Sequence, residues 1–290
     1  MPYGNVGNRP SRKRLVMLTY NVFGDESSDQ KCEVVFAVGG IFGDETQWDS
    51  LATKWVGITQ GEEFHAAEWD NPERGDQYKA LTLALAESML VGWGDAMDVR
   101  EYARLFPDAV QQLPYYFCFG AVIEHFAKYT PLCIPRGIVN FTFDQNLQVQ
   151  RHASAIYHDM LDNPAWTDRQ YVADEITYST RKNPKIQIAD LWTREIMKHV
   201  YNLHGPQQRP MRRSLAALRK TNRFGFDIHE TDFFESMKKK FSETYREGRA
   251  IGEYEAWRDK LGIQDNTESR LRYMFYLNKK EAGKISDATL

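Results

Sequence analysis

Cysteine is scarce in this sequence, and the few cysteines follow no pairing pattern. Cys32, Cys118 and Cys133 are the three in the chain. An odd number of cysteines without metal-like or paired spacing supports neither a disulfide framework nor a thiolate zinc site. We therefore expect the protein to work in a reducing compartment.

The chain also lacks a long hydrophobic run. Its first ten residues, Met-Pro-Tyr-Gly-Asn-Val-Gly-Asn-Arg-Pro, contain no apolar core of a signal peptide. The longest apolar stretch, about Leu113 to Ile123, is far too short to span a bilayer. These two absences predict a cytoplasmic protein without a membrane partner.

Common catalytic motifs are missing as well. The sequence has no Walker phosphate-binding loop, no dinucleotide fingerprint, no nucleophile elbow around a serine and no zinc-ligand pattern. The chemistries that depend on these motifs therefore have little support.

What the sequence does contain is enough apolar material for a large core. The chain has 290 residues, of which 42% are hydrophobic, 27% charged and 13% aromatic, a composition typical of a folded globular protein. The length allows one large domain, or one domain with an accessory piece.

The charges are distributed unevenly, although the net charge is only -3. Residues 1–180 contain 14 Lys and Arg against 25 Asp and Glu, a balance of -11, and residues 181–290 contain 23 against 15, a balance of +8. An acidic front and a basic back suggest an acidic site combined with a surface that binds phosphate backbones. A set of solvated, Lys- and Arg-rich helices explains the same counts with comparable weight.

The segment from Leu15 to Phe23 is apolar or β-prone at almost every position, which predicts a central strand covered on both faces. Gly24, Asp25 and Glu26 follow it, so two adjacent carboxylates are expected where a buried strand meets solvent. If the strand continues that far, Asp25 and Glu26 point to opposite faces and cannot both enter one site. Taken alone, these residues are ordinary turn formers.

The rest of the first 204 residues alternates between strand and helix patterns. Further strands are predicted at 34–42, 91–99, 138–146 and 171–180, and helices at 47–57, 77–90, 110–129, 148–161 and 186–200. The short polar link between the first two strands favours a hairpin, and hence an antiparallel pair. This order predicts the α/β class, with a mixed sheet flanked by helices.

Two more acids stand at the ends or beginnings of these elements. Asp144 closes the strand at 138–146 beside turn-forming residues, and Asp190 lies next to the apolar stripe of the helix at 186–200, in its first turn or two. On its own, Asp190 is better explained as an acid that interacts favourably with the helix dipole, worth about 0.3 to 1 kcal/mol. If the strands that carry Asp25 and Asp144 are parallel neighbours, however, both acids meet at one sheet edge, where α/β folds place ligand sites.

Converging carboxylates repel one another unless cations neutralise them. Mg²⁺ and Mn²⁺ accept such hard oxygen ligands, and two of these ions about 4 Å apart activate a water and stabilise the leaving oxygen of a phosphodiester. We therefore expect Mg²⁺ or Mn²⁺ as the cofactor if Asp25, Asp144 and Asp190 come together.

Beyond residue 204 the chain becomes polar and basic. We expect three parts: a loose, basic-ended tail at 1–14, a core at 15–204, and a basic helical extension at 205–290 packed on the core, with helices at 232–245, 253–261 and 271–277. One acid-free run in the extension is the predicted nucleic-acid-binding surface: Arg209, Arg212, Arg213, Arg219, Lys220 and Arg223.

The motifs Phe23-Gly-Asp25-Glu26-Ser27-Ser28, Phe64-His65-Ala66, the strand ending in Asp144, and Ile186-Gln-Ile-Ala-Asp190 resemble the family catalogued as domain of unknown function 3800. The resemblance covers about residues 15 to 202. Ser28 replaces the usual Gly of the first hallmark, and Ile replaces both Leu residues of the second. The resemblance implies a ribonuclease H-like fold with a metal-binding acidic cluster.

Carried onto this chain, the resemblance makes Asp25, Asp144 and Asp190 the metal ligands, while Glu26 and Glu68 compete for the fourth position. His65 lies three residues before Glu68 and either orients water or phosphate at the site, or pairs with Glu68 in a structural role.

Three functions remain open from the sequence. The first is a divalent-metal-dependent nuclease that hydrolyses RNA, DNA or a hybrid. The second is a non-catalytic nucleic-acid-binding or scaffold protein of the same fold, in a defence or mobile-element system. The third is a hydrolase of small phosphoesters, which would use the metals but not the basic helices.

Overall fold

A computed structural model of the chain describes residues 19–106, 113–133, 137–147, 150–164 and 166–236, together with 239, 255–259 and 262. The predicted tail at 1–14, the first residues of the predicted first strand and most of the chain beyond 236 lie outside the described residues. The helix predicted at 271–277 is also outside them.

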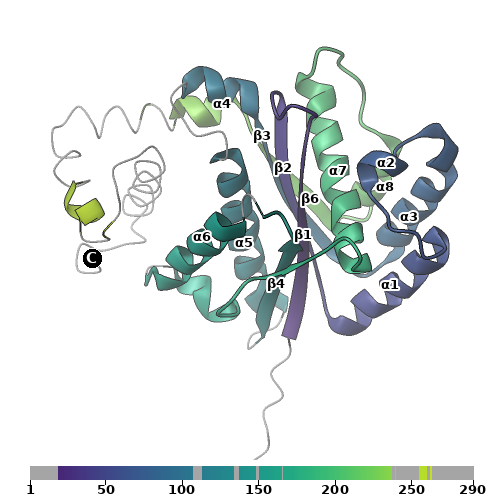
Figure 1. Ribbon diagram of the computed structural model, residues 1–290, viewed down its shortest axis with the longest axis horizontal. Coiled ribbons are helices and arrows are strands. Elements are labelled where there is room, and N and C mark those ends of the chain that lie inside the picture. The colour runs from purple at the N-terminus through teal and green to yellow at the C-terminus, as the bar shows by residue number, and fades with distance from the viewer. Residues whose placement is uncertain are drawn as a thin grey trace, which may run out of the picture.

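The described chain forms an α/β structure around a mixed sheet (Figure 1). Its strands are β1 Thr19–Ser28, β2 Val35–Gly43, β3 Val91–Asp98, β4 Ile138–Asp144, β5 Thr177–Ser179 and β6 Phe224–His229. They lie in the order β5-β4-β1-β2-β3-β6. The β1-β2 and β2-β3 pairs are antiparallel, and β1-β4, β4-β5 and β3-β6 are parallel. The predicted α/β class and the hairpin of the first two strands are confirmed, and β1 and β4 are the parallel neighbours that the meeting of Asp25 and Asp144 requires.

Helices cover both faces of the sheet, which Figure 1 shows nearly edge-on. One face packs against α1 Glu45–Thr59, α2 Ala66–Trp69, α3 Gly75–Glu87, α7 Pro184–His204 and α8 Arg213–Arg219. The other packs against α4 Val99–Leu105, α5 Leu113–Cys133 and α6 Gln150–Asp162. Two short 3₁₀ helices are η1 Pro72–Arg74 and η2 Thr167–Tyr171. The two faces therefore have separate apolar cores, one beneath α7 and one beneath α5.

The two helix starts that frame the α7 face have clear local causes. Asp44 caps α1 through a reciprocal pair of hydrogen bonds with Gln47. At α7, Asn183 accepts a hydrogen bond from the Lys185 backbone amide, and Pro184 occupies the first turn, where its missing N–H costs nothing. These caps begin the helices a few residues earlier than the apolar periodicity indicated.

Three sequence expectations about the elements are wrong. The first strand does not end before the acids but runs through Asp25 and Glu26 to Ser28. The predicted strand at 171–180 shrinks to Thr177–Ser179, preceded by a 3₁₀ turn and a single bridge between Val172 and Val139. Finally, the expectation of helices alone beyond 205 fails at Phe224–His229, which forms β6 and extends the core sheet next to β3.

The sequence does contain a strand pattern for β6, but the charged residues around it made the pattern easy to miss. Phe224, Phe226 and Ile228 alternate with polar or small residues, which is the period of a half-buried strand. These three side chains pack on the apolar core beneath α7. The charged neighbourhood therefore concealed a piece of the central sheet.

No helix within the described ranges is long and apolar enough to cross a membrane.

Candidate functional site

The acids of β1 and β4 are brought side by side by strand register. Gly24 pairs with Phe143 in the parallel β1-β4 ladder, so the next positions along both strands are Asp25 and Asp144. Phe143 belongs to the core beneath α5, so Asp144, one residue later, faces α7 instead. The sheet edge predicted from the sequence therefore does place these two acids next to each other.

Asp25 also faces α7, and glycines explain how closely the helix approaches. Asp25 lies opposite Gly39 in the antiparallel ladder, and directly opposite residues share a face. A Cβ added to Gly39 would lie 2.5 Å from the Oγ1 atom of Thr193 on α7. Gly94 on β3 pairs with Gly39, and its lack of a side chain likewise leaves room for Ile196 of α7. This glycine row lets α7 lie almost directly on the strands beside Asp25.

Thr193 fastens α7 to the strand at this point. Its hydroxyl lies 2.9 Å from the carbonyl oxygen of Ala189, one turn earlier, and 3.3 Å from the carbonyl oxygen of Asp25. The helix is thereby held in register with β1, and Asp190 is carried to the acidic edge of the sheet.

Asp190 is the third acid of the group, and it is almost fully buried. Its Oδ2 atom accepts a hydrogen bond from the backbone amide of Ala66 at 2.8 Å, which ties the start of α2 to α7. Burial raises the pKa of Asp190, while the Ala66 amide and the charges of His65 and Arg181 oppose that rise. The site thus combines groups from β1, β4, α7 and the start of α2.

Asp25 has the most strained electrostatic position of the three. It is 1% exposed, and burial together with the charges of Asp190, Glu26 and Asp144 raises its pKa well above the ordinary value. Its Oδ1 atom accepts a hydrogen bond from the Glu26 amide at 2.8 Å. Its Oδ2 atom is buried and has no hydrogen-bond partner among the described residues. A buried carboxylate oxygen without a partner is costly, and a cation would satisfy it.

Arg181, in the loop after β5, is the cation that this group already has. Its Nε atom lies 3.4 Å from the Oδ2 atom of Asp144. Burial would lower the pKa of Arg181, but the charges of Asp25, Asp190, Asp144 and Glu26 together raise it. The guanidinium group is therefore a partial counter-charge for the acidic cluster, and the sequence reasoning did not identify it.

Glu26 points to the opposite face of the sheet. Its neighbour two residues earlier, Gly24, faces Phe143 in the core beneath α5, and strand alternation puts Glu26 on that same side. The Oε1 atom of Glu26 accepts a hydrogen bond from the Asn146 side-chain amide at 2.6 Å. Burial raises the pKa of Glu26 to about 7, with the Asn146 hydrogen bond opposing the rise. Glu26 therefore borders the acidic group without facing α7.

His65 and Glu68 form a contact of their own at the rim. The Nδ1 atom of His65 lies 3.2 Å from the Oε1 atom of Glu68, whose side chain is 76% exposed. His65 immediately precedes the Ala66 amide that binds Asp190, and its charge acts on the Asp190 carboxylate. The pairing of His65 with Glu68 is thus present, and it holds the imidazole beside Asp190 while Glu68 itself extends into solvent.

The acidic group is not arranged to hold a metal ion directly. Within the described residues, no three or more His, Cys, Asp or Glu side chains stand in a geometry that would ligate one ion. The donors still fit Mg²⁺ or Mn²⁺ in kind, because they are hard carboxylate oxygens and one of them is buried with no hydrogen-bond partner in the part of the chain that the structure describes. Ion binding would therefore need side-chain rotations, with Arg181 yielding its place beside Asp144.

The predicted basic surface divides into structural and exposed residues. Arg212 donates two hydrogen bonds to Asp70, at 2.6 and 2.7 Å, and Arg223 donates to the carbonyl oxygens of Ala86 and Ser88. The guanidinium group of Arg219 lies 5.3 Å from the ring centroid of Phe226. Arg219 is nevertheless exposed, and so are Arg209, Arg213 and Lys220.

No family model, no curated protein and no solved structure matches this chain. The site is therefore interpreted from its own geometry.

Several residues of the site were missed in the sequence, and the signals differ. Arg194, whose charge opposes the rise in the pKa of Asp190, follows that residue by four positions on α7, so its place beside Asp190 could be predicted from helical spacing. Gly39 and Gly94 are glycines inside strands, which often mark close backbone approach. Arg181 lies in a loop whose path depends on β5, and no local sequence pattern indicates that its side chain reaches the acids.

Proposed function

We propose that this protein is a Mg²⁺- or Mn²⁺-dependent nuclease that hydrolyses phosphodiester bonds of RNA, DNA or a hybrid. The observation that carries the proposal is the gathering of Asp25, Asp144 and Asp190 on one face of the sheet, with a buried Asp25 oxygen that has no hydrogen-bond partner among the described residues. Repulsion within such a group is relieved when divalent cations bind.

We also propose that the sheet is of the ribonuclease H-like type and that the chain belongs to the family of domain of unknown function 3800. The strand order and directions support this fold, because β1 is central, β2 and β3 continue it as an antiparallel meander, and β4 and β5 run parallel to it. The acids lie on β1, at the end of β4 and on a late helix, as the resemblance implies.

In this proposal Asp25, Asp144 and Asp190 hold the metal. Bound divalent ions supply an activated water and stabilisation of the leaving oxygen. His65 then orients a water or a phosphate oxygen next to Asp190, and Glu68 fixes the imidazole through its Nδ1 atom. Thr193 and the Ala66 amide keep the acids of β1 and α7 aligned.

The test is a cleavage assay with purified protein and labelled RNA, DNA and hybrid in Mn²⁺ or Mg²⁺. We expect cleavage by the wild type and a loss of at least about 100-fold in Asp25→Asn and Asp190→Asn. Asp76→Asn serves as the matched control, since Asp76 is exposed at the start of α3 and should leave activity unchanged. Equal cutting by the wild type and both site variants, or cutting that persists in a chelator, would remove the proposal.

Thermal melting separates an enzyme from an inert scaffold of the same fold. A metal-binding site predicts a rise in melting temperature with added Mn²⁺ that disappears in Asp25→Asn, because ions that bind the native state stabilise it. A protein that binds nucleic acid but gains no stability from Mn²⁺ would instead be a non-catalytic binding protein. Cleavage of small phosphoesters with no action on polymers would indicate the third function.

A further inference from the structure

A group of cationic side chains lies beside α7 and begins one helical turn beyond Asp190. The carboxylate of Asp70 is at its centre: Arg212 donates two hydrogen bonds to it, and the Nη2 atom of Arg194 lies 4.0 Å from its Oδ2 atom. Although burial acts in the other direction, the hydrogen bonds and charge of Arg212 lower the pKa of Asp70. This carboxylate is thus ionised and shared between two guanidinium groups.

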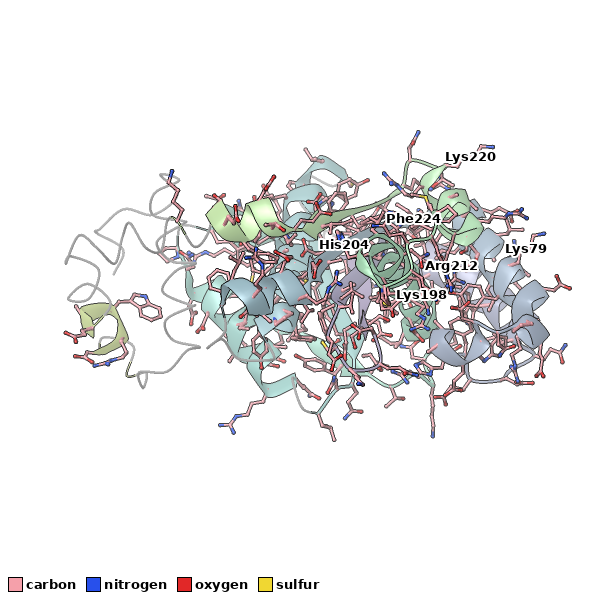
Figure 2. All side chains as sticks on the ribbon, turned by 90° about the horizontal axis from the view of Figure 1, so that it is seen from above. Lys79, Lys198, His204, Arg212, Lys220 and Phe224 are labelled. Atoms are coloured by element: carbon pink, nitrogen blue, oxygen red, sulfur yellow. The ribbon has the colours of Figure 1, made fainter. Side chains whose placement is uncertain are left out.

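Two more cations join them. Lys198 follows Arg194 by one helical turn, and no carboxylate of the described chain comes within 4.0 Å of its amine. Burial and the charges of Arg194, Arg212 and Arg209 lower the pKa of Lys198, while the charge of Asp70 acts in the opposite direction. Figure 2 shows Lys198, on α7, and Arg212, at the start of α8, next to each other. We call Arg194, Lys198, Arg209 and Arg212 the α7 cation cluster.

Positive charge exceeds negative charge in this cluster. Two acids lie beside these four cations. One is Asp70, and the other is Glu195, which is fully buried and accepts hydrogen bonds from Tyr78 and Ser214. The Nη2 atom of Arg212 lies 3.5 Å from the Oε1 atom of Glu195, so Arg212 is satisfied by both acids. Lys198 and the exposed Arg209 are left with the surplus charge.

The cluster is aligned with the acidic site rather than scattered around it. Asp190, Arg194 and Lys198 are spaced four residues apart on α7, so they share one side of the helix, about 6 and 12 Å apart along its axis. The segment of Ala66 and Asp70 runs along that side, with Ala66 bonded to Asp190 and Asp70 near Arg194. A path of increasing positive charge therefore starts at the acids.

We propose that the α7 cation cluster binds the phosphate backbone of a nucleic-acid strand, with Lys198 and Arg209 as the phosphate contacts and the scissile bond at Asp25, Asp144 and Asp190. This inference rests on the proposed nuclease function and identifies where its substrate lies. A distance of about 12 Å corresponds to three or four nucleotides at about 3.4 Å per nucleotide. Arg212 and Arg194 act through Asp70: their contacts with this carboxylate keep the surface along which the strand lies rigid and positively charged.

The experiment measures binding of labelled single-stranded and duplex oligonucleotides in EDTA by fluorescence anisotropy, so that no cutting is required. The test variant is Lys198→Gln/Arg209→Gln. The control is Lys79→Gln/Lys128→Gln, which removes the same charge from two exposed lysines. Lys79 lies on α3, where Figure 2 shows it away from Lys198, and Lys128 lies on α5, which covers the other face of the sheet. Lys198→Arg/Arg209→Lys keeps the charges and checks that the fold tolerates changes at both positions.

We expect the test variant to weaken binding about tenfold or more and to reduce the salt slope by about 1.4 on single strands, or 1.8 on duplexes, the value for two lost phosphate contacts. The control and the charge-keeping variant should stay within about twofold of the wild type. Equal losses in test and control would reduce the effect to general electrostatics and overturn the proposal. Strong competition by inorganic phosphate alone would also overturn it, in favour of a single anion site.

The failure of this inference can be distinguished from failure of the nuclease proposal. If the test variant loses binding but Asp25→Asn has no effect on cleavage, the α7 cation cluster binds nucleic acid and the catalytic assignment is wrong. If Asp25→Asn abolishes cleavage while the test variant binds and cuts as the wild type does at every salt concentration, the acids are catalytic and the α7 cation cluster is not the binding surface.

Discussion

Asp25 and Asp144 are neighbours across the parallel strands β1 and β4, and both project toward α7. They come from positions far apart in the chain, and strand register alone brings them together. The predictions below follow from that juxtaposition and from the helix that lies on it.

Replacing Asp25 with Asn should stabilise the metal-free protein. The wild-type carboxyl is buried among other acids, which raises its pKa well above its usual value. An amide removes that repulsion, and we expect the free energy of unfolding in EDTA to rise by about 1 kcal/mol or more at pH 8. Urea denaturation measures this change. An equal or lower stability would contradict the electrostatic account of the site, whereas the exposed control Asp76→Asn should change little.

The pH dependence of stability should report Glu26. Its pKa is 4.5 as an ordinary glutamate and about 7 in the folded chain, so between these values the unfolded state releases a proton that the folded state keeps. In EDTA the contribution of Glu26 to stability is therefore lost progressively as pH rises from 4.5 to 7 and is constant above that. The lowered pKa of Asp70 acts in the more acid range below 3.8.

The check is a series of urea melts across this range. The fall in stability should be smaller in Glu26→Gln than in the wild type or in Glu73→Gln, whose carboxylate is exposed in η1. The same slope in all three proteins would mean that Glu26 does not titrate in this window.

Arg181→Gln should lower the stability of the metal-free protein and increase the stabilisation that Mn²⁺ provides. The guanidinium group is a counter-charge for Asp25, Asp144 and Asp190, so its loss should lower the melting temperature in EDTA. Added Mn²⁺ should then produce a larger rise in melting temperature than in the wild type, because a competing cation is gone. Lys182→Gln, at the exposed next position, is the control. A smaller Mn²⁺ response in Arg181→Gln would indicate that Arg181 supports ion binding.

Gly39→Ala should push α7 away from the acids. The new methyl group would lie 2.5 Å from the Thr193 hydroxyl oxygen and 3.3 Å from the Thr193 Cα atom, so helix backbone must shift. Overpacking of this kind costs about 1 to 3 kcal/mol. Gly57→Ala, on α1 with no atom within 4 Å of the new Cβ, should gain about 0.5 to 1 kcal/mol instead. If both variants melt alike, the close approach of α7 is not important for stability.

Arg212→Ala should act on stability, unlike its neighbour. Its guanidinium group is held between Asp70 and the buried Glu195, and its removal leaves both acids without their main cation. We expect a loss of roughly 2 to 4 kcal/mol. Arg213→Ala, one residue on and exposed, should stay within about 0.5 kcal/mol. Equal, small effects of the two changes would return Arg212 to the surface role that the sequence suggested.

Apolar periodicity and capping residues are local properties, and they were enough to predict the α/β class, most of the helices and strands, and the acids worth testing. Asp25, Asp144 and Asp190 were identifiable as acids at or near the ends of elements. Even the opposite directions of Asp25 and Glu26 follow from strand alternation once the strand is known to continue to Ser28.

Which side chains lie next to one another could not be predicted in this way, because it depends on the folded chain as a whole. The β1-β4 register, the contact of α7 with Gly39 and the loop that carries Arg181 all depend on pairings between distant segments. The same holds for the basic residues, since Arg212 and Arg213 look alike in the sequence and differ only in whether Asp70 and Glu195 lie beside them. Electrostatic energy depends on distance and burial in three dimensions, and neither is a property of a residue and its immediate neighbours in the chain.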